Sequence, residues 1–293
     1  MNTSTQCDLS VIIVNYNAAD LIIRCLESVA SQSGVKSEVI VVDNCSQDGS
    51  QELLKNSFTW IEFISNNRNL GFARANNQAL KICKSRYIYY LNPDTEVRPN
   101  AFRKMVDFMD SHPNVGLAGT RLVYPDGSLQ SSVENSYPGQ RYAKNDLKGL
   151  KGDIAWVLGA SMITRQTVIR DLEGFDEHFF LYGEDIDLCL RIRKAGWLIG
   201  YIPGAEVVHW EGQSERSNLP VKVWEKKIKA EFIFYRKHYS SRAIRAIERS
   251  NLLQSNWRIF TLSLALPFLK NKEKALAKLD KYKTVQKILG QQK

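Results

Sequence analysis

The 293-residue chain has 44% hydrophobic and 24% charged residues, as folded globular proteins do, so intrinsic disorder is excluded. Its formal charge of +9 comes from residues 221–293, which hold 18 Lys and Arg against 5 Asp and Glu and carry +13, whereas residues 1–220 carry −4. The five cysteines are widely spaced and form no C-x-x-C pair, which excludes a disulfide framework and a zinc site and favours a reducing cytoplasm.

The sequence shows no sign of insertion into a membrane. Residues 1–8 are polar and lead directly into a predicted strand, so we expect no signal peptide. We also expect no membrane span, because the chain lacks a run of about 18 apolar residues.

Short apolar runs alternate with helical patterns over the first 120 residues, which is typical of βαβ units in a mostly parallel sheet. Because the carboxyl ends of parallel strands share one edge, we expect Asn15, Asp43 and Asp94 to lie on one rim. The fold class is therefore α/β, with a Rossmann-like sheet and flanking helices. Strands are predicted at residues 9–14, 38–42, 60–64, 86–91 and 115–120, and helices at residues 21–29 and 72–82.

The second half of the chain is less regular. Residues 134–153 are rich in glycine and polar residues, which predicts a mobile loop that orders over a ligand. We divide the chain into a catalytic domain of residues 1–220 and a basic, helical C-terminal extension of residues 221–293. Further strands are predicted at residues 129–133, 154–164, 197–202 and 205–208, and a helix at residues 184–195.

Asp94 follows an apolar strand in Asn92-Pro93-Asp94, where Pro93 forces the chain to leave the sheet. A carboxylate at this point can hold a hard divalent cation against a diphosphate. Asp94 can equally be a turn or helix-capping residue, and the spacing leaves both explanations open.

Three carboxylates, those of Glu184, Asp185 and Asp187, stand at a predicted helix start directly after Phe179 and Phe180. Acidic residues in a first helical turn interact favourably with the helix dipole, which is the structural explanation. The aromatic side chains would also desolvate the acids, raise their pKa and make a better general base. We therefore favour a catalytic role.

Two further features suit an anionic ligand or a metal. Gly71 and Arg74 belong to a polar loop and the helix start that follows it, a natural anion-binding arrangement. Asn15 and Asn17 follow the first strand, but this loop lacks the glycines that a dinucleotide pyrophosphate requires. Their absence weakens an interpretation as a nicotinamide or flavin enzyme. His209 follows a β-branched strand and is either a metal ligand or a core histidine.

In combination these strings resemble glycosyltransferase family 2, of the GT-A fold. The resemblance rests on residues 10–17, 41–49, 69–73 and 92–94. Residues 159–162, 174–176, 183–187 and 208–209 resemble in particular the bacterial rhamnosyltransferases and related galactofuranosyltransferases. The similarity covers about residues 9–212.

The resemblance implies an inverting, metal-dependent hexosyltransferase that uses a dTDP- or UDP-sugar, with rhamnose from dTDP-rhamnose as the first candidate. Asp185 would be the general base, Asp43 would bind the pyrimidine base, and Asp94 and His209 would hold Mg²⁺ or Mn²⁺. Asn92 stands at the first position of the D-x-D metal motif, so this motif has one carboxylate here. The expected donor-binding residues are Asn15, Asn17, Asp43, Asn69, Gly71, Arg74, Asn92 and Asp94.

The acceptor is expected to be a cell-envelope glycan or a polyprenyl-diphosphate-linked sugar. Glu184 and Asp187 are expected to contact it, and Trp156 and Tyr182 either stack on sugar faces or belong to the core. We expect no nucleic-acid partner.

The apolar run at residues 257–269, with the lysines that follow it, suits an anionic membrane surface. It suits equally a helix packed on the catalytic domain or on the second subunit of a homodimer. With a membrane partner, the protein would be cytoplasmic and peripheral at the inner face of the cell membrane. Rival interpretations are a nucleotidyltransferase or dinucleotide oxidoreductase on a similar sheet, and a catalytically inactive nucleotide-binding membrane scaffold.

Overall fold

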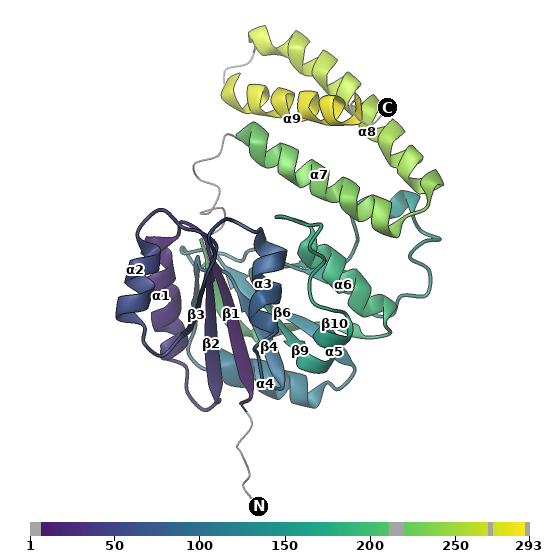
Figure 1. Cartoon of the computed structure of the whole chain (residues 1–293). Coiled ribbons are helices and arrows are strands. Elements are labelled where there is room, and N and C mark those ends of the chain that lie inside the picture. The colour runs from purple at the N-terminus through teal and green to yellow at the C-terminus, as the bar shows by residue number, and fades with distance from the viewer. Residues whose placement is uncertain (1–6, 211–219, 269–271, 291–293) are drawn as a thin grey trace, which may run out of the picture. The chain divides into compact units, whose positions relative to one another are not determined.

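The computed structural model describes residues 7–210, 220–268 and 272–290 (Figure 1). These residues form two compact units. The first comprises the described parts of Met1–Tyr137, Leu150–Phe180 and Glu184–Ser214. The second comprises the described parts of Pro138–Gly149, Leu181–Gly183 and Glu215–Lys293.

A mixed sheet forms the centre of the first unit. In the described residues its strand order is β3-β2-β1-β4-β9-β6-β10-β5, and only β9 and β5 run against the common direction. The predicted α/β class with a mostly parallel sheet is confirmed. The strands are β1 (Leu9–Asn15), β2 (Ser37–Asp43), β3 (Glu62–Ser65), β4 (Tyr87–Leu91), β5 (Thr95–Val97), β6 (Val115–Val123), β9 (Ser161–Arg165) and β10 (Leu198–His209).

Helices cover both faces of this sheet, and β1 shows why. Its side chains alternate between the faces, so Val11 and Ile13 enter one apolar core while Ile12 and Val14 enter the other. Residues of α1 and α4 complete the first core, and residues of α3, α5 and α6 complete the second. The helices are α1 (Ala19–Ala30), α2 (Ser50–Ser57), α3 (Phe72–Leu80), α4 (Ala101–Ser111), α5 (Gln166–Asp171) and α6 (Glu184–Lys194).

Four predicted strands differ from the observed ones. The strand predicted at residues 129–133 is reduced to an isolated bridge between Leu129 and Val123 and the first residue of β7. The strand predicted at residues 154–164 is interrupted after β8 (Trp156–Val157), which pairs with β7 (Val133–Glu134) in a separate small sheet. The predicted strands 197–202 and 205–208 form one strand, β10, with a register shift between Ile202 and Glu206. Such an irregularity keeps a strand paired while changing its twist. Pro203 and Gly204 interrupt the apolar pattern at this point, so the sequence predicted two strands.

The predicted mobile loop at residues 134–153 is largely anchored. Within the second unit, the Tyr239 hydroxyl donates to the Pro138 carbonyl at 2.6 Å, and the Ser240 hydroxyl donates to Asp146 at 3.1 Å. A Cβ on Gly139 would lie 2.7 Å from the Ile247 side chain, so the chain here packs closely on a helix. Residues 138–149 are therefore part of the helical unit and do not form a free loop.

The C-terminal extension is helical, as predicted. It contains α7 (Pro220–His238), α8 (Ser241–Ala265), a short 3-10 helix, η3 (Leu266–Phe268), and α9 (Lys272–Gly290). Within this unit α9 lies between α7 and α8 (Figure 1). No helix in the described ranges is long and apolar enough to cross a membrane.

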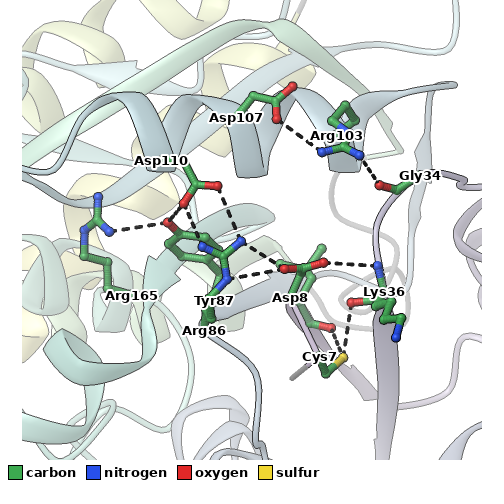
Figure 2. A network of polar contacts seen from close by, with 11 residues as sticks. Cys7, Asp8, Gly34, Lys36, Arg86, Tyr87, Arg103, Asp107, Asp110 and Arg165 are labelled. Atoms are coloured by element: carbon green, nitrogen blue, oxygen red, sulfur yellow. Dashed lines mark hydrogen bonds and ion pairs between the residues drawn. The ribbon is translucent and has the colours of Figure 1, made fainter. Parts of the chain in front are cut away.

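An ion-pair network closes the amino-terminal edge of the sheet (Figure 2). Arg86 bridges Asp8 at 2.9 Å and Asp110 at 2.8 Å, and the Tyr87 hydroxyl donates to Asp110 at 2.6 Å. Arg165 joins the same group through the Tyr87 hydroxyl at 3.4 Å. These residues tie the starts of β1 and β4 to α4, which leaves the opposite, carboxyl-terminal edge for a ligand.

Candidate active site

The candidate site lies at the carboxyl-terminal edge of the sheet. Asn15 ends β1 and Asp43 ends β2, and the two residues are direct partners in the parallel register. β4 ends at Leu91, which is paired with Ile13 of β1, so the loop of residues 92–94 leaves the sheet at the same edge. The rim predicted for Asn15, Asp43 and Asp94 is present in the structure.

Asp43 is the centre of a buried polar cluster at this edge. Its Oδ1 accepts a hydrogen bond from the Asn15 amide at 2.8 Å, and its Oδ2 accepts from the Ser46 N–H at 2.9 Å and from Gln51 at 2.6 Å. The Asp43 side chain is fully buried. A carboxylate has about four acceptor positions, and donors from within the chain occupy three of them here.

The loop before α3 is organised by Asn44. Its Nδ2 donates to Asn69 Oδ1 at 2.9 Å and to the Gly71 carbonyl at 3.2 Å, while its Oδ1 accepts from the Leu70 N–H at 2.9 Å. Gly71 has φ +86°, and a Cβ there would lie 2.6 Å from the Phe180 carbonyl oxygen. The position therefore requires glycine, and the loop of residues 69–71 is held against Phe180.

Asn17 and Arg74 are the exposed members of the predicted donor site. Asn17 adopts a left-handed backbone, with φ 51°, and its Oδ1 accepts from the Gln47 N–H at 2.8 Å. Arg74 stands in the first turn of α3 and forms a 2.7 Å ion pair with Glu177. An anionic ligand at Arg74 would therefore compete with this carboxylate.

Asp94 and His209 meet at the same edge. β10 pairs with β5 so that His209 lies opposite Thr95, and this brings His209 Nε2 to 3.5 Å from Asp94 Oδ1. Both side chains are about 95% buried. On the other side of the imidazole, Nδ1 lies 3.0 Å from Gln130 Oε1, an acceptor that suits a proton on Nδ1. In that tautomer Nε2 would be the atom available to a metal.

These residues fit a divalent cation that is shared with a diphosphate. The buried Nε2 of His209 and Oδ1 of Asn92 have no hydrogen-bond partner among the described residues. No group of three or more His, Cys, Asp and Glu side chains suited to a metal is present in the described ranges. Mg²⁺ sites commonly combine one or two protein ligands with substrate phosphates. Asp94 and His209 are therefore enough as protein ligands.

Asp185 stands in the first turn of α6, and two backbone donors orient its carboxylate. Gly159 N–H donates to Oδ2 at 3.0 Å and Ile186 N–H donates to Oδ1 at 2.8 Å. The residue after Gly159, Ala160, accepts a 2.9 Å hydrogen bond from the Asn92 N–H. The break between β8 and β9 therefore joins the Asp185 carboxylate to the loop that carries Asp94.

Glu184 and Asp185 form a pair of buried acids. Burial raises the pKa of Glu184 to about 8, and the charge of Asp185 adds to the rise. Burial also raises the pKa of Asp185, although its two backbone donors oppose this rise. Glu184 Oε2 has no hydrogen-bond partner among the described residues. Both carboxyls are therefore weaker acids than exposed ones, and the backbone donors of Gly159 and Ile186 favour the charged form of Asp185.

Asp187 has a structural position in the first unit. Its side chain is fully buried, and its Oδ2 accepts from Arg191 at 2.7 Å one helical turn later. Arg191 in turn donates to the carbonyls of Leu172 at 2.9 Å and Gly174 at 2.8 Å. This ion pair fixes the chain ahead of α6, and the contact of Asp187 with an acceptor stays a prediction.

Three aromatic residues lie near the candidate base, Asp185. Phe180 and Tyr182 precede it in the sequence, and Trp156 belongs to β8, which contacts α6. Trp156 is half-buried, and its indole N–H donates to the Ser136 carbonyl at 3.2 Å. Tyr182 belongs to the second unit, where the Lys227 ammonium lies 4.9 Å from the centre of its ring. Phe180, which was expected to desolvate the acids together with Phe179, is 51% exposed beside Gly71.

The geometry is that of a GT-A glycosyltransferase. The structure of a mannosyltransferase from Pyrobaculum calidifontis, in complex with GDP-Man and Mn²⁺, is similar with a TM-score of 0.62 at 15% identity, over 97% of this chain and 87% of that chain. The Glycosyl transferase family 2 model matches residues 10–172. The chain belongs to this family, as its motifs predicted.

Two curated relatives are similar over most of their length. The N-acetylglucosaminyl-diphospho-decaprenol L-rhamnosyltransferase of Mycobacterium tuberculosis is 25% identical over 236 residues, which are 70% of this chain and 77% of the relative. The rhamnosyltransferase WbbL of Escherichia coli K12 is 25% identical over 229 residues, 71% of this chain and 85% of the relative.

Sequence reasoning missed the residues that orient the predicted ones. Gln130, Asn44 and Gly159 each hold a candidate site residue through a hydrogen bond to a distant part of the chain. Asn44 and Gly159 had a sequence signal, because they belong to the strings 41–49 and 159–162 that carry the family resemblance. Nothing in the local sequence distinguishes Gln130.

Proposed function

We propose that this chain is an inverting glycosyltransferase that moves a sugar from a nucleoside diphosphate to an acceptor hydroxyl. The observation that carries the proposal is the pair of hydrogen bonds from Asn92 to Ala160 and from Gly159 to Asp185. They support a single site in which a buried base faces the same edge as the proposed diphosphate ligands. Residues 1–220 would form the catalytic domain and residues 221–293 an extension.

The donor would bind along the carboxyl-terminal edge. Asp43 would accept from the pyrimidine base with its remaining acceptor position, and Asn17 and Arg74 are exposed for the sugar or phosphates. Asn15, Asn69, Gly71 and Asn92 would shape the floor of this site. Rhamnose from dTDP-rhamnose is the first donor to test, because both curated relatives are named rhamnosyltransferases.

Asp94 and His209 would hold Mg²⁺ or Mn²⁺, with the donor diphosphate completing the coordination. The bound cation would neutralise negative charge that develops on the departing nucleoside diphosphate. Gln130 would keep the proton on Nδ1 of His209, which leaves Nε2 as the ligand atom.

Asp185 would act as the general base. It accepts the proton of the acceptor hydroxyl while that oxygen forms a bond to the anomeric carbon, and the bond from this carbon to the diphosphate oxygen breaks with its electron pair. One displacement inverts the anomeric centre, so no second carboxylate has to act as a covalent nucleophile. Glu184, protonated at neutral pH, would donate a hydrogen bond to the acceptor.

The acceptor would be a cell-envelope glycan or a lipid-linked sugar. The name of the mycobacterial relative, which contains a sugar linked to diphospho-decaprenol, supports the second. Trp156, Tyr182 and the exposed Phe180 are candidates for stacking on the acceptor sugar, because aromatic rings pack well on apolar sugar faces. Asp187 would support this region through Arg191. The protein would work at the inner face of the cell membrane, as a monomer or a homodimer.

The test measures release of nucleoside diphosphate from a panel of dTDP-, UDP- and GDP-sugars with a matching acceptor. We expect Asp185→Asn to lower turnover by about 10²-fold or more while donor affinity stays within a few fold, because the base acts on the acceptor. Calorimetry with the donor supplies the affinity.

Asp187→Asn is the matched control, since it removes a carboxylate two residues away that is paired with Arg191. We expect it to lower the melting temperature, which Asp185→Asn should change little. Near-normal turnover of Asp185→Asn would refute Asp185 as the base. Donor binding without turnover of any sugar in the wild-type protein would instead favour an inactive scaffold.

A further inference from the structure

Helix α8 carries an apolar stripe that the described residues leave exposed. Its members are 69% exposed at Leu253, 63% at Trp257, 59% at Phe260 and 60% at Leu264, and Phe268 of η3 follows at 87%. They are spaced four, three, four and four residues apart, which places residues of an α-helix on one face. We call these five residues the α8 stripe.

The opposite side of α8 packs against the rest of the helical unit. Ser255 is buried there, and Ile259 and Leu262 are half-buried. These three positions lie about half a turn from the stripe at 100° per residue. Within the helical unit, α8 packs against α9. The stripe is therefore not needed to bury the interior of the unit, and exposed apolar surface of this extent marks an interaction site.

The positive charge around the α8 stripe indicates an anionic partner. Helices α8 and α9 together hold ten Lys and Arg against three Asp and Glu. Arg249 and Arg258 on α8, and Lys272, Lys274 and Lys278 on α9, are exposed. Lysine and arginine beside Trp, Phe and Leu suit the interface of an anionic bilayer, where the apolar side chains enter the acyl boundary and the cations remain at the headgroups.

We propose that the α8 stripe docks on an anionic lipid bilayer, with α8 lying in the plane of the interface. A helix of 25 residues is about 37 Å long, so it would contact the surface along its length without crossing it. The inference extends the proposed function, since a lipid-linked acceptor would be presented at this surface. It depends on no catalytic residue.

The test is flotation of the full-length protein with vesicles of phosphatidylglycerol and phosphatidylethanolamine, compared with phosphatidylcholine alone. We expect binding to the anionic vesicles only, weakened by 0.5 M salt because exposed charges are screened within a few ångströms at that ionic strength. The triple variant Trp257→Ser/Phe260→Ser/Leu264→Ser should bind about tenfold more weakly or worse. Circular dichroism would establish that the variant keeps its helices.

The matched control is Trp60→Ser/Leu129→Ser, which removes two apolar side chains of the first unit that are 46% and 63% exposed. It should bind vesicles like the wild type. Equal binding by the triple variant and the wild type would overturn the proposal. A wild type that binds no vesicle and is a dimer, with a monomeric triple variant in light scattering, would also overturn it and assign the stripe to a second copy.

The release of nucleoside diphosphate with a water-soluble acceptor separates this inference from the proposed function. The triple variant should match the wild type in that assay, because the stripe lies outside the catalytic residues. If neither protein turned over a donor while the wild type still bound anionic vesicles, the proposed function would fail and the docking surface would stand.

Discussion

At the scale of single residues, the pair Glu184 and Asp185 determines how activity depends on pH. Asp185 must be deprotonated to accept a proton, whereas Glu184 must be protonated to donate a hydrogen bond. Activity should therefore rise with pH through the pKa of Asp185. It should fall, by about tenfold per unit, above the pKa of Glu184 near 8.

The variant Glu184→Gln tests this assignment, because glutamine still donates a hydrogen bond but does not ionise. We expect activity near pH 7 to stay within a few fold of the wild type and the alkaline decline to disappear. A pH profile of kcat/KM for both proteins is the measurement. An unchanged alkaline limb in the variant would mean that another group causes it.

Gln130 should control the metal site through the tautomer of His209. We expect Gln130→Leu to weaken Mn²⁺ binding about 10–100-fold in the presence of nucleoside diphosphate, since it removes the acceptor that orients the imidazole. Electron paramagnetic resonance of Mn²⁺ measures the affinity without relying on turnover. Gln130→Glu keeps an acceptor and should retain most of the binding, and equal affinity in wild type, Gln130→Leu and His209→Ala would exclude His209 as a ligand.

At the scale of elements, the junction between the loop before α3 and the segment before α6 depends on one glycine. Gly71 accommodates the approach of Phe180, whose carbonyl accepts from the Phe72 N–H at 2.8 Å. An added Cβ would meet a backbone oxygen, which cannot move as the end of a flexible side chain can. The two loops that would hold donor and base are therefore tied together at this point.

We expect Gly71→Ala to lower the free energy of unfolding by about 1–3 kcal/mol and to weaken donor binding as well, because the clash displaces the loop. Urea unfolding and calorimetry measure the two effects. Gly127→Ala is the matched control, since Gly127 has a similar φ of +82° with open space around its Cβ position. If both variants lost the same stability and bound donor equally, the contact with Phe180 would have no role.

At the scale of the whole molecule, the central sheet has one edge for chemistry and one for stability. The carboxyl-terminal edge leaves buried acceptors of Asn92 and His209 without partners among the described residues. At the amino-terminal edge, Arg86 and Tyr87 satisfy the carboxylate of Asp110 (Figure 2). Hydrogen bonds from both lower the pKa of Asp110, although burial alone would raise it.

This network predicts an acid-sensitive contribution to stability. Because the folded pKa of Asp110 is below its ordinary value of 3.8, the contribution is present above that pH and is lost as the pH falls through the folded pKa. Asp110 is 46% exposed, so we expect Asp110→Asn to cost about 1 kcal/mol or less at pH 7. The cost should shrink as the pH falls through the folded pKa, because the wild-type carboxyl then becomes neutral as well.

Urea unfolding at several pH values is the measurement, and Asp107→Asn is the control. Asp107 lies on the same helix but is 61% exposed and 3.5 Å from its partner Arg103. Its removal should change stability little at any pH. A pH-independent cost for Asp110→Asn would show that the hydrogen bonds, and not the charge, stabilise this edge.

The sequence by itself determined the class of the fold and the edge of the site. Apolar runs with period two and helical patterns between them reflect burial on both faces of a sheet, which is local information. The strand ends at Asn15, Asp43 and Leu91 follow from this pattern, and so does the polar rim. The family motifs within residues 10–172 added the class of enzyme.

Only the tertiary structure determined which side chains orient the candidate residues. Gln130 reaches His209 over 79 positions, and Gly159 reaches Asp185 over 26, because packing of the sheet, its loops and α6 brings together segments that are far apart in the chain. Likewise, α6 buries Asp187 and pairs it with Arg191, whereas Phe180 remains exposed. Local sequence records how apolar a segment is, but the partner of a buried polar atom depends on the packing of the whole chain.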